Sequence, residues 1–330
     1  MNRRPLVLKP SIAVSGFLQM KTAEGLSPNT LVSYKHLLSV WVSHTPDIPV
    51  DRLKVQHLRE FFAWLRTDYK PRRFSRSERP LAAKSIRNAW IALSAFFTWA
   101  CVEFKFDDPM QGIPPPKFED APIEPFTKEQ VELLLKSIEF CNIARTERRK
   151  KFTMRRMTAR RDRAMILFLL DTGLRASEFC SLTIGDVDQK TGRVVVKHGT
   201  LGGAKGGKGR VVFIGKSTRS ALWRYLIERT DNDDANAPLF TSRMGCAMTK
   251  TALRLMLVDL GKKAGVEKCH PHRFRHTFAI TYLRSSGDLF TLQALLGHSS
   301  LEMVQHYARI AEIDIAQVHR RASPADNWHL

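Results

Sequence analysis

A proline-rich segment divides this chain and limits the folds open to it. Six prolines lie within residues 107–125, three of them in the run 114–116. Proline lacks a backbone N–H and clashes with the preceding turn, so this segment cannot be the interior of a helix and favours an extended linker. The chain has 330 residues, more than one typical domain needs. We therefore predict an N-terminal domain over 1–106, a linker over 107–125 and a second domain over 126–330.

The N-terminal domain has the apolar spacing of helices. Ser27 followed by Pro28 suits a helix start, with serine at the N-cap and proline at the first helical position. Three stretches repeat apolar residues every three or four positions. Their members are Leu31, Tyr34, Leu38 and Trp41; Leu58, Phe61, Phe62 and Leu65; and Ile86, Trp90, Leu93, Phe97 and Ala100. We expect a small bundle of three or four helices.

The second domain mixes helices with a short β region. Thr127 and Gln130 have the spacing of a capping box and predict a helix start. The β-branched runs 194–196 and 211–214 have the length and composition of strands. Residues 199–209 between them are rich in glycine and lysine, but the pattern is not that of a nucleotide-binding loop, so it predicts a hairpin turn. With helices again from residue 249 onward, the fold class is mainly α with a small β-sheet.

The charge balance indicates a polyanionic partner. Lysine and arginine number 53 against 32 acidic residues, which gives a net charge of +21 and a pI near 10.1. Nucleic acid is the commonest partner for such an excess, and a membrane surface is the alternative. No run of about 18 apolar residues is present, so we predict no spanning segment and no membrane partner. Residues 145–163 hold ten basic positions, which form either a solvated helix face or a phosphate-contacting segment.

The cysteines point to a reducing compartment. There are five, an odd number, and none forms a C-x-x-C pair. Reduced thiols in a cytoplasmic protein fit this pattern. Cys269, His270 and His272 do not have the spacing of a closed zinc site, and no cluster of acidic residues suggests a metal pair. We predict neither a metal nor another cofactor.

Four short stretches in the second domain concentrate basic residues beside turns and helix starts. They are Thr172-Gly-Leu-Arg-Ala-Ser-Glu178, Lys205-Gly-Gly-Lys208, His272-Arg-Phe-Arg-His276, and Leu296-Gly-His298 followed by Tyr307. Each has an ordinary structural explanation when it is taken alone. Their order, spacing and residue types together resemble the tyrosine recombinases, also called the phage integrase family, with its Xer and integrase members. The resemblance covers nearly the whole chain.

The resemblance implies both a fold and a site. The fold would be a helical-bundle core-binding domain followed by a mixed α/β catalytic domain that ends in a C-terminal exchange segment. The implied catalytic residues are Arg175, Lys205, His272, Arg275, His298 and the nucleophile Tyr307. Lys208 and Lys197 are close enough to compete with Lys205 for the role of the catalytic lysine.

These residue types suit attack of a phenol on a phosphodiester. Arginines stay charged and can bind two phosphate oxygens at once, so Arg175 and Arg275 suit stabilisation of the transition state. The two histidines can donate to the same oxygens or move a proton, and a hairpin lysine can protonate the leaving oxygen. The implied product is a 3′-phosphotyrosine link. Because that link conserves the phosphodiester energy, religation needs no ATP.

The implied partners are double-stranded DNA and further copies of the chain. The resemblance predicts a tetramer on two DNA sites, acting in the cytoplasm on nucleoid DNA, with residues 310–321 docked on a neighbouring subunit. A type IB topoisomerase-like enzyme and a noncatalytic DNA-binding protein are the alternative functions. The residues do not separate integration, transposition and dimer resolution, nor do they name accessory proteins.

Several neighbours of the motifs are assigned supporting roles. Glu178 is expected to orient the Arg175 helix by hydrogen bonding, whereas His276 and His306 are interpreted as packing and solvent-facing residues. Ser299 and Glu302 have capping-box spacing, so a helix should begin near residue 300 and carry Tyr307 about two turns along.

Overall fold

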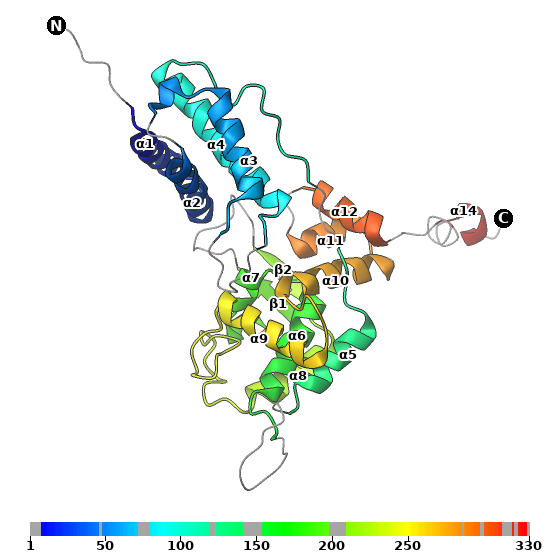
Figure 1. The fold of residues 1–330 in the computed structure, drawn as a ribbon. Coiled ribbons are helices and arrows are strands. Elements are labelled where there is room, and N and C mark those ends of the chain that lie inside the picture. The colour runs from blue at the N-terminus through cyan, green and yellow to red at the C-terminus, as the bar shows by residue number, and fades with distance from the viewer. Residues whose placement is uncertain are drawn as a thin grey trace. The chain divides into compact units, whose positions relative to one another are not determined.

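A computed structural model describes most of the chain. The described residues are 8–45, 48–71, 79–118, 123–140, 154–197, 209–285, 287–297, 300–311, 319 and 323–328. The chain forms two compact units, which divide between residues 121 and 122 (Figure 1). No helix within the described ranges is both long enough and apolar enough to cross a membrane.

The N-terminal unit is a helical bundle. Its helices are α1 Pro10–Ala23, α2 Pro28–His44, α3 Val55–Thr67 and α4 Ala83–Phe104, with a 3₁₀ turn, η1, at Val50–Arg52. The predicted start of α2 is confirmed, since the Ser27 hydroxyl accepts a hydrogen bond from the Thr30 N–H at 3.3 Å. The predicted apolar face of α3 is confirmed as well. Its four buried residues are Leu58, Phe61, Phe62 and Leu65.

Aromatic rings fill the centre of this bundle. Trp41 of α2 lies with its ring centroid 5.4 Å from Phe96 and 5.5 Å from Phe97, both on α4. The two phenylalanine rings are 5.0 Å apart and nearly perpendicular, an arrangement that aromatic pairs favour. All three side chains are fully buried, so this cluster fixes α2 against α4.

The proline-rich segment contains no helix in its described part, as predicted. Its first half is packed against α4. The indole N–H of Trp90 donates to the carbonyl of Ile113 at 3.0 Å, and Arg87 donates to the carbonyl of Pro116 at 3.2 Å. This half of the segment is therefore held by the helix that precedes it.

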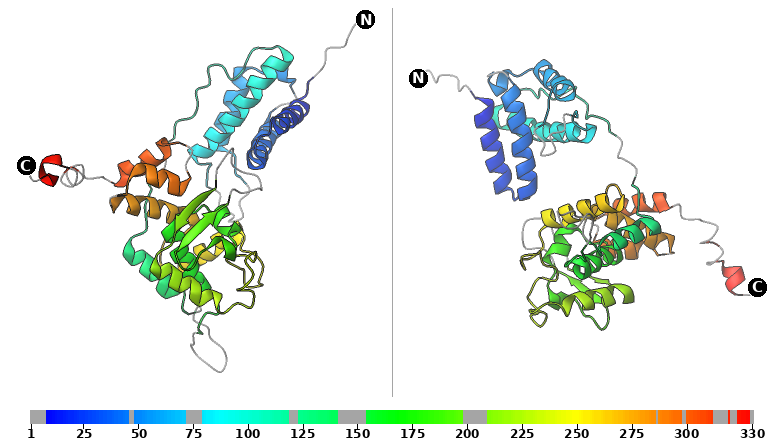
Figure 2. Two further views of the ribbon diagram at one scale, coloured as in Figure 1. Left: turned by 180° about the vertical axis from the view of Figure 1, so that it is seen from behind. Right: turned by 60° about the horizontal axis from the view of Figure 1, so that its bottom comes forward.

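The C-terminal unit is mainly helical and carries a two-stranded sheet (Figure 2). Its helices are α5 Lys128–Ser137, α6 Ala159–Thr172, α7 Ala176–Ser181, α8 Lys216–Leu226, α9 Lys250–Ala264, α10 Pro271–Arg284, α11 Leu289–Leu296, α12 Glu302–Ala311 and α14 Pro324–Asn327, with a 3₁₀ turn, η2, at Ile184–Asp186. The capping box predicted at Thr127 and Gln130 is confirmed by two reciprocal hydrogen bonds of 3.3 Å. The helix with Tyr307 begins at Glu302, two residues later than expected.

The predicted strands are present and paired. Strand β1 (Arg193–Val196) runs antiparallel to β2 (Arg210–Phe213), with Val194 opposite Val212 and Val196 opposite Arg210. Val194, Val196 and Val212 point into the core, because alternate residues of a strand face the same side. The glycine-rich turn expected between the strands, with Lys205 and Lys208, lies outside the described residues.

Two apolar clusters position the rest of this unit. The first surrounds α6, whose residues 164–166 and 168–169 are fully buried. The second joins three helices of the C-terminal half, α10, α11 and α12. Its buried members are Ala279, Ile280, Leu283, Leu292, Leu296, Val304 and Tyr307. This second cluster brings α12 against α10, so a residue of α12 can meet the motif residues of α10.

Two arginines in the described part of the basic segment serve an internal purpose, whereas Arg155, Arg160 and Arg163 are exposed. Asp162 on α6 is fully buried and pairs with Arg156 at 3.1 Å and with Arg161 at 2.6 Å. Arg161 also donates to the carbonyl of Thr241 at 2.9 Å. For these two arginines, both sequence interpretations were wrong, because their charges compensate a buried carboxylate rather than face solvent or phosphate. Residues 141–153 of the segment lie outside the described part.

Candidate active site

Arg275 lies at the centre of the candidate site. It sits on α10, and its side chain is only 1% exposed. Nη1 donates to the carbonyl of Gly173 at 2.9 Å, and Nη2 donates to the carbonyl of Leu296 at 2.8 Å. Burial and the neighbouring Arg175 lower the pKa of this guanidinium to about 10, which leaves it charged at neutral pH.

Arg175 reaches the same place from a different element. It is the N-cap residue of α7, and its side chain is 41% exposed. Its guanidinium approaches the carbonyls of Leu296 at 3.4 Å and Gly297 at 3.3 Å. The carbonyl of Leu296 is thus an acceptor for both arginines, which places their cationic groups side by side.

Two glycine turns make this convergence possible. Gly173 ends α6 with φ +57°, and Gly297 ends α11 with φ +62°, a region that glycine enters without steric cost. A Cβ at Gly173 would lie 2.6 Å from the ring of Phe278, so the turn also needs the missing side chain for space. The carbonyls that accept from Arg275 belong to Gly173 itself and to Leu296, the residue before Gly297.

Glu178 supports Arg175, as the sequence predicted. Its carboxylate accepts from the Arg175 backbone N–H at 2.9 Å and from the Arg175 side chain at 3.0 Å. Arg210 at the start of β2 also donates to both carboxylate oxygens, at 2.9 and 2.8 Å, and to the carbonyl of Leu295 at 2.7 Å. Burial raises the pKa of this carboxyl, but the hydrogen bonds and charges of Arg210 and Arg175 outweigh it and bring the pKa to about 2.

Tyr307 points into the same region from α12. Its side chain is 4% exposed, and its hydroxyl lies 2.9 Å from Nδ1 of His276. Burial raises the pKa of the phenol. The charges of Arg275 and Arg175, and a hydrogen bond with Arg275, oppose that rise, so Tyr307 lies within the field of both guanidinium groups.

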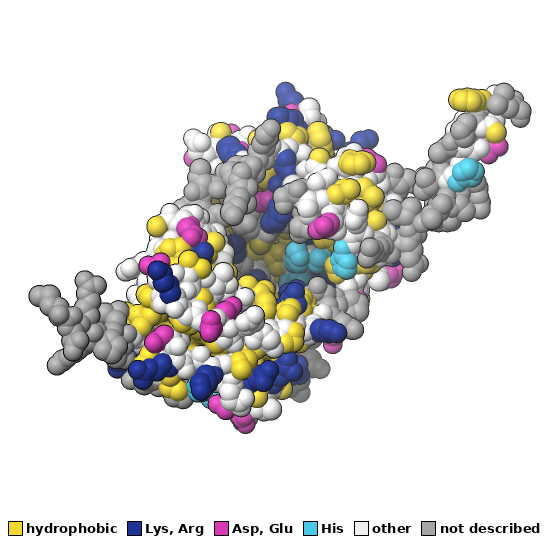
Figure 3. Space-filling model, turned by 90° about the horizontal axis from the view of Figure 1, so that it is seen from above, with side chains coloured by type: hydrophobic (Ala, Val, Ile, Leu, Met, Phe, Trp, Pro, Cys, Tyr) yellow, Lys and Arg dark blue, Asp and Glu magenta, His cyan; other side chains and the backbone are white. Residues whose placement is uncertain are grey.

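Two histidines of α10 lie beside the tyrosine, with their rings packed edge to face. His272 and His276 are one helical turn apart, and their ring centroids are 4.2 Å from each other. Burial, followed by the charges of Arg275, His270 and Arg175, lowers the pKa of His272. Histidine side chains gather close to basic side chains on the face drawn in Figure 3.

The structure brings together four of the six residues that the sequence singled out. These are Arg175, His272, Arg275 and Tyr307. Lys205 and His298, and the competing Lys208, lie outside the described residues. The other competitor, Lys197, pairs with Asp186 at 2.6 Å.

Two residues of the site were missed by sequence reasoning. His276 was interpreted as a packing residue, which is wrong because its ring contacts the hydroxyl of Tyr307. The four-residue spacing from His272 was a usable signal, since such positions share one face of a helix. Arg210 had no comparable signal, because its partner Glu178 is distant in sequence. His306 is exposed, as expected.

The cysteine and histidine before α10 have structural roles. His270 caps the helix by accepting a hydrogen bond from the Arg273 N–H at 3.2 Å. Burial raises the pKa of the Cys269 thiol to about 12, so this sulfur is a poor metal ligand. Within the described ranges, no three histidine, cysteine or acidic side chains meet as metal ligands would.

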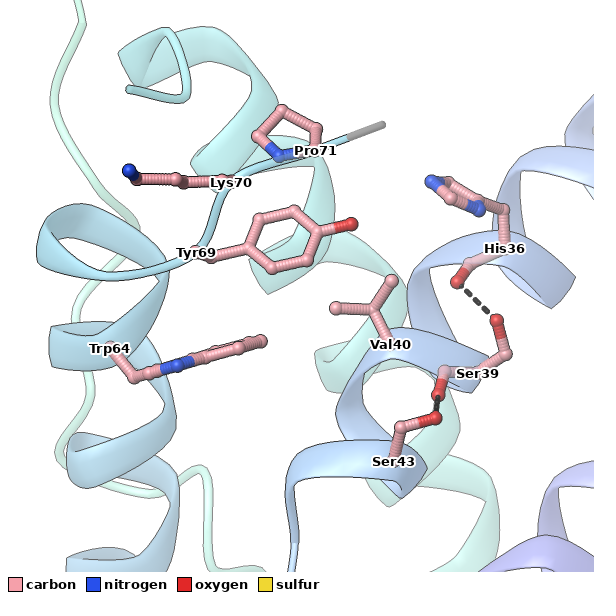
Figure 4. A pocket seen from close by; sticks show the side chains of 8 residues that line it. All are labelled: His36, Ser39, Val40, Ser43, Trp64, Tyr69, Lys70 and Pro71. Atoms are coloured by element: carbon pink, nitrogen blue, oxygen red, sulfur yellow. Dashed lines mark hydrogen bonds between the residues drawn. The ribbon is translucent and has the colours of Figure 1, made fainter. Parts of the chain in front are cut away.

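A separate pocket of about 410 Å³ lies in the N-terminal unit (Figure 4). Its walls come from α2, from α3 and from the residues that follow α3. They are His36, Ser39, Val40, Ser43, Trp64, Tyr69, Lys70 and Pro71. The hydroxyls of Ser39 and Ser43 bond to carbonyls of their own helix, at 2.7 and 2.8 Å. The pocket contains none of the motif residues, so it is not the candidate active site.

Comparison with protein families gives matches along both units. The phage integrase family matches residues 126–313, and the phage integrase N-terminal SAM-like domain matches residues 14–103. A tyrosine recombinase XerC from Actinobacillus pleuropneumoniae is 32% identical over 74% of this chain and 74% of its own length. A tyrosine recombinase XerA from Thermococcus kodakarensis is 28% identical over 95% of this chain and 96% of its own.

Solved structures have the same fold. The Tn1549 transposon integrase in complex with a circular intermediate DNA is 21% identical, with a TM-score of 0.70 over 89% of this chain and 94% of that one. A lambda integrase dimer bound to a COC′ core site is 15% identical, with a TM-score of 0.66 over 90% of this chain and 97% of that one. These likenesses confirm the predicted fold class, a helical core-binding domain with a catalytic domain that is mainly helical and has a small sheet.

Proposed function

This chain belongs to the phage integrase family and is a tyrosine site-specific recombinase that breaks and rejoins DNA, and we propose that Tyr307 is its nucleophile. Arg175 and Arg275 bind the phosphate under attack. Lys205, His272 and His298 complete the catalytic set, as the family resemblance implied, with Lys208 as the alternative lysine.

The single observation that carries this assignment is the shared carbonyl of Leu296. It accepts from Arg175 at 3.4 Å and from Arg275 at 2.8 Å, so two cations from separate motifs meet at one point. A guanidinium has five N–H donors, and each arginine therefore keeps donors for a phosphate oxygen. Tyr307 lies close enough to Arg275 for the guanidinium to lower the pKa of the phenol.

The chemistry follows from these charges. Attack by the phenolic oxygen builds negative charge on the nonbridging oxygens of the phosphate, and fixed cationic donors stabilise that charge. His272 and His298 donate to the same oxygens, and the lysine gives a proton to the departing 5′ oxygen. The resulting 3′-phosphotyrosine conserves the energy of the broken bond, so a 5′ hydroxyl can attack it and rejoin the strand.

The two units divide the work of DNA binding. The N-terminal domain, residues 1–106, grips the duplex, the linker 107–125 allows closure, and residues 126–330 hold the catalytic site. The net charge of +21 supports binding to the phosphate backbone. One similar structure is a XerH recombinase bound to a difH substrate, and another is a lambda integrase dimer on a core site. We extend this to a tetramer on two DNA sites that acts in the cytoplasm, at the nucleoid.

A nicked duplex tests the nucleophile. The target is first selected by the protein from random-sequence DNA, and a nick is then placed just 3′ of the cleaved phosphate. Cleavage releases the short 5′-hydroxyl fragment, so religation fails and the protein stays covalently attached. We expect an adduct with the wild type and none with Tyr307→Phe, although that variant still binds the duplex.

Tyr282 supplies the matched control. It lies on α10 with its ring centroid 5.9 Å from Phe278, and Tyr282→Phe should form the adduct at the wild-type rate. An adduct with Tyr307→Phe, or its loss with Tyr282→Phe alone, would overturn the assignment of the nucleophile.

A further inference from the structure

We propose that His276 is the base that accepts the phenolic proton of Tyr307 during DNA cleavage. This inference rests on the proposed role of Tyr307 as the nucleophile. His276 follows Arg275 on α10, and its Nδ1 lies 2.9 Å from the Tyr307 hydroxyl on α12. That separation is within the range required for direct proton transfer. Acceptance at Nδ1 requires the tautomer that carries its proton on Nε2.

Tyr307 needs a local acceptor for its proton. Its side chain is almost fully buried, and burial raises the pKa of the phenol despite the opposing charges of Arg275 and Arg175. A phenol with such a pKa is a weak nucleophile at neutral pH unless a base takes its proton as the oxygen attacks. The ring of His276 is in contact with that hydroxyl before DNA binds.

His276 is in the protonation state that a base requires. Burial is the main cause that lowers its pKa, to about 4. The charged and titratable groups that face it also lower this pKa: His272, Arg275 and the N-cap residue His270 from α10, and His306 from α12. At pH 7 the imidazole is therefore neutral and able to accept a proton.

The cleavage step needs no reactant other than the DNA, the two side chains and an acid that protonates the leaving 5′ oxygen. The bond from the Tyr307 oxygen to phosphorus forms as the bond from phosphorus to the 5′ oxygen breaks. The phenolic proton moves to Nδ1 of His276, which becomes an imidazolium, and the departing 5′ oxygen takes a proton from the lysine or from water. In religation the imidazolium returns its proton to the tyrosine.

The substitution His276→Gln separates proton transfer from positioning. A glutamine oxygen can accept the hydrogen bond of the phenol, but it cannot take the proton. We expect single-turnover cleavage to slow by about a hundredfold, within the usual range for loss of a general base, while affinity for the duplex stays the same. His306→Gln is the matched control, because His306 is an exposed histidine beside Tyr307, and it should cleave within about threefold of the wild type.

The pH profile gives a readout that a structural defect would not move. Because His276 is neutral above about pH 5, its protonation should not limit wild-type cleavage between pH 7 and 9. Without the base, the rate depends on the phenolate fraction, which rises about tenfold per pH unit below the phenol pKa. His276→Gln should therefore show this slope, and a profile parallel to the wild type would overturn the proposal.

A DNA substrate with sulfur in place of the bridging 5′ oxygen locates the defect. A thiolate departs without a proton, so this substrate relieves the loss of a general acid but not the loss of a base. We expect the His276→Gln defect to persist on it. If the sulfur substrate restored the cleavage rate of His276→Gln, His276 would be the acid that protonates the leaving group, and the proposal would be refuted. Covalent adduct formation by Tyr307→Phe would instead refute the proposed nucleophile, so the two failures remain distinct.

Discussion

Arg210 donates hydrogen bonds to both carboxylate oxygens of Glu178, at 2.9 and 2.8 Å. The same carboxylate holds Arg175 through its backbone and its side chain. Two guanidinium groups therefore share one negative charge, which leaves Arg175 with net positive charge for a phosphate. Arg210 also bonds to the carbonyl of Leu295, so β2, α7 and the end of α11 are joined at one residue.

Removal of Arg210 should slow DNA cleavage indirectly, by its effect on the charge of Arg175. In Arg210→Gln, the Glu178 carboxylate has only Arg175 as its cationic partner and neutralises it more fully. We expect single-turnover cleavage to fall by about ten- to a hundredfold, less than the loss of a direct transition-state donor. The double variant Arg210→Gln/Glu178→Gln should recover part of that loss, because the excess negative charge is gone.

Arg193 supplies the matched control for this comparison of the Arg210 and Glu178 variants. It lies on the neighbouring strand β1, and its side chain is exposed. Arg193→Gln should cleave DNA close to the wild-type rate. Strictly additive losses in the Arg210 and Glu178 variants would show that the two residues do not act as a unit.

Glu178 should make the stability of the fold depend on pH in the acidic range. Its pKa is about 2 in the folded protein, below the ordinary value of 4.5, so its ionised form stabilises the fold. That contribution is complete above about pH 4.5 and is lost as the pH falls toward 2. Between these two pH values, the melting temperature of the wild type should therefore fall by more than that of Glu178→Gln. Equal slopes for the two proteins would contradict the assigned pKa.

Arg275→Lys should be a severe change despite the conserved charge. A lysine has no fork of N–H groups, so it cannot donate both to Gly173 and to Leu296 while it also faces a phosphate. We expect cleavage to fall by about 10²–10³-fold in single-turnover assays. Arg284→Lys, at the exposed end of the same helix, should have nearly normal activity. Comparable activity in the two variants would remove Arg275 from the site.

Gly173→Ala should destabilise the fold for two separable reasons. An alanine at φ +57° costs roughly 1–2 kcal/mol, and its Cβ would also overlap the ring of Phe278. Gly265 ends α9 at φ +69° with no atom within 4 Å of the corresponding Cβ, so Gly265→Ala carries only the first cost. In thermal melts, Gly173→Ala should lower the melting temperature more than Gly265→Ala does. Equal melting temperatures would mean that Phe278 moves aside freely.

The local patterns of the sequence determined several elements in both units. The capping box at Thr127, the serine cap of α2, the apolar face of α3 and the two valine runs all correspond to observed structure. These features depend on neighbours within one or two turns, which is why spacing alone reveals them. The motifs around Arg175, Arg275 and Tyr307 were identified differently, because their order and residue types together resemble those of the tyrosine recombinases.

Tertiary packing decided which side chains touch. His276 contacts Tyr307 because the apolar cluster of α10, α11 and α12 brings two distant helices together, and no spacing rule encodes that approach. Arg210 bonds to a carboxylate 32 residues away, and Arg156 and Arg161 pair with the buried Asp162 instead of facing a polyanion. The sequence by itself thus established the chemical groups and the helices that bear them. The partner of each group was decided only by the fold. A charge or hydroxyl that is buried away from water needs a hydrogen-bond partner from the protein, and tertiary packing decides which group lies close enough to serve.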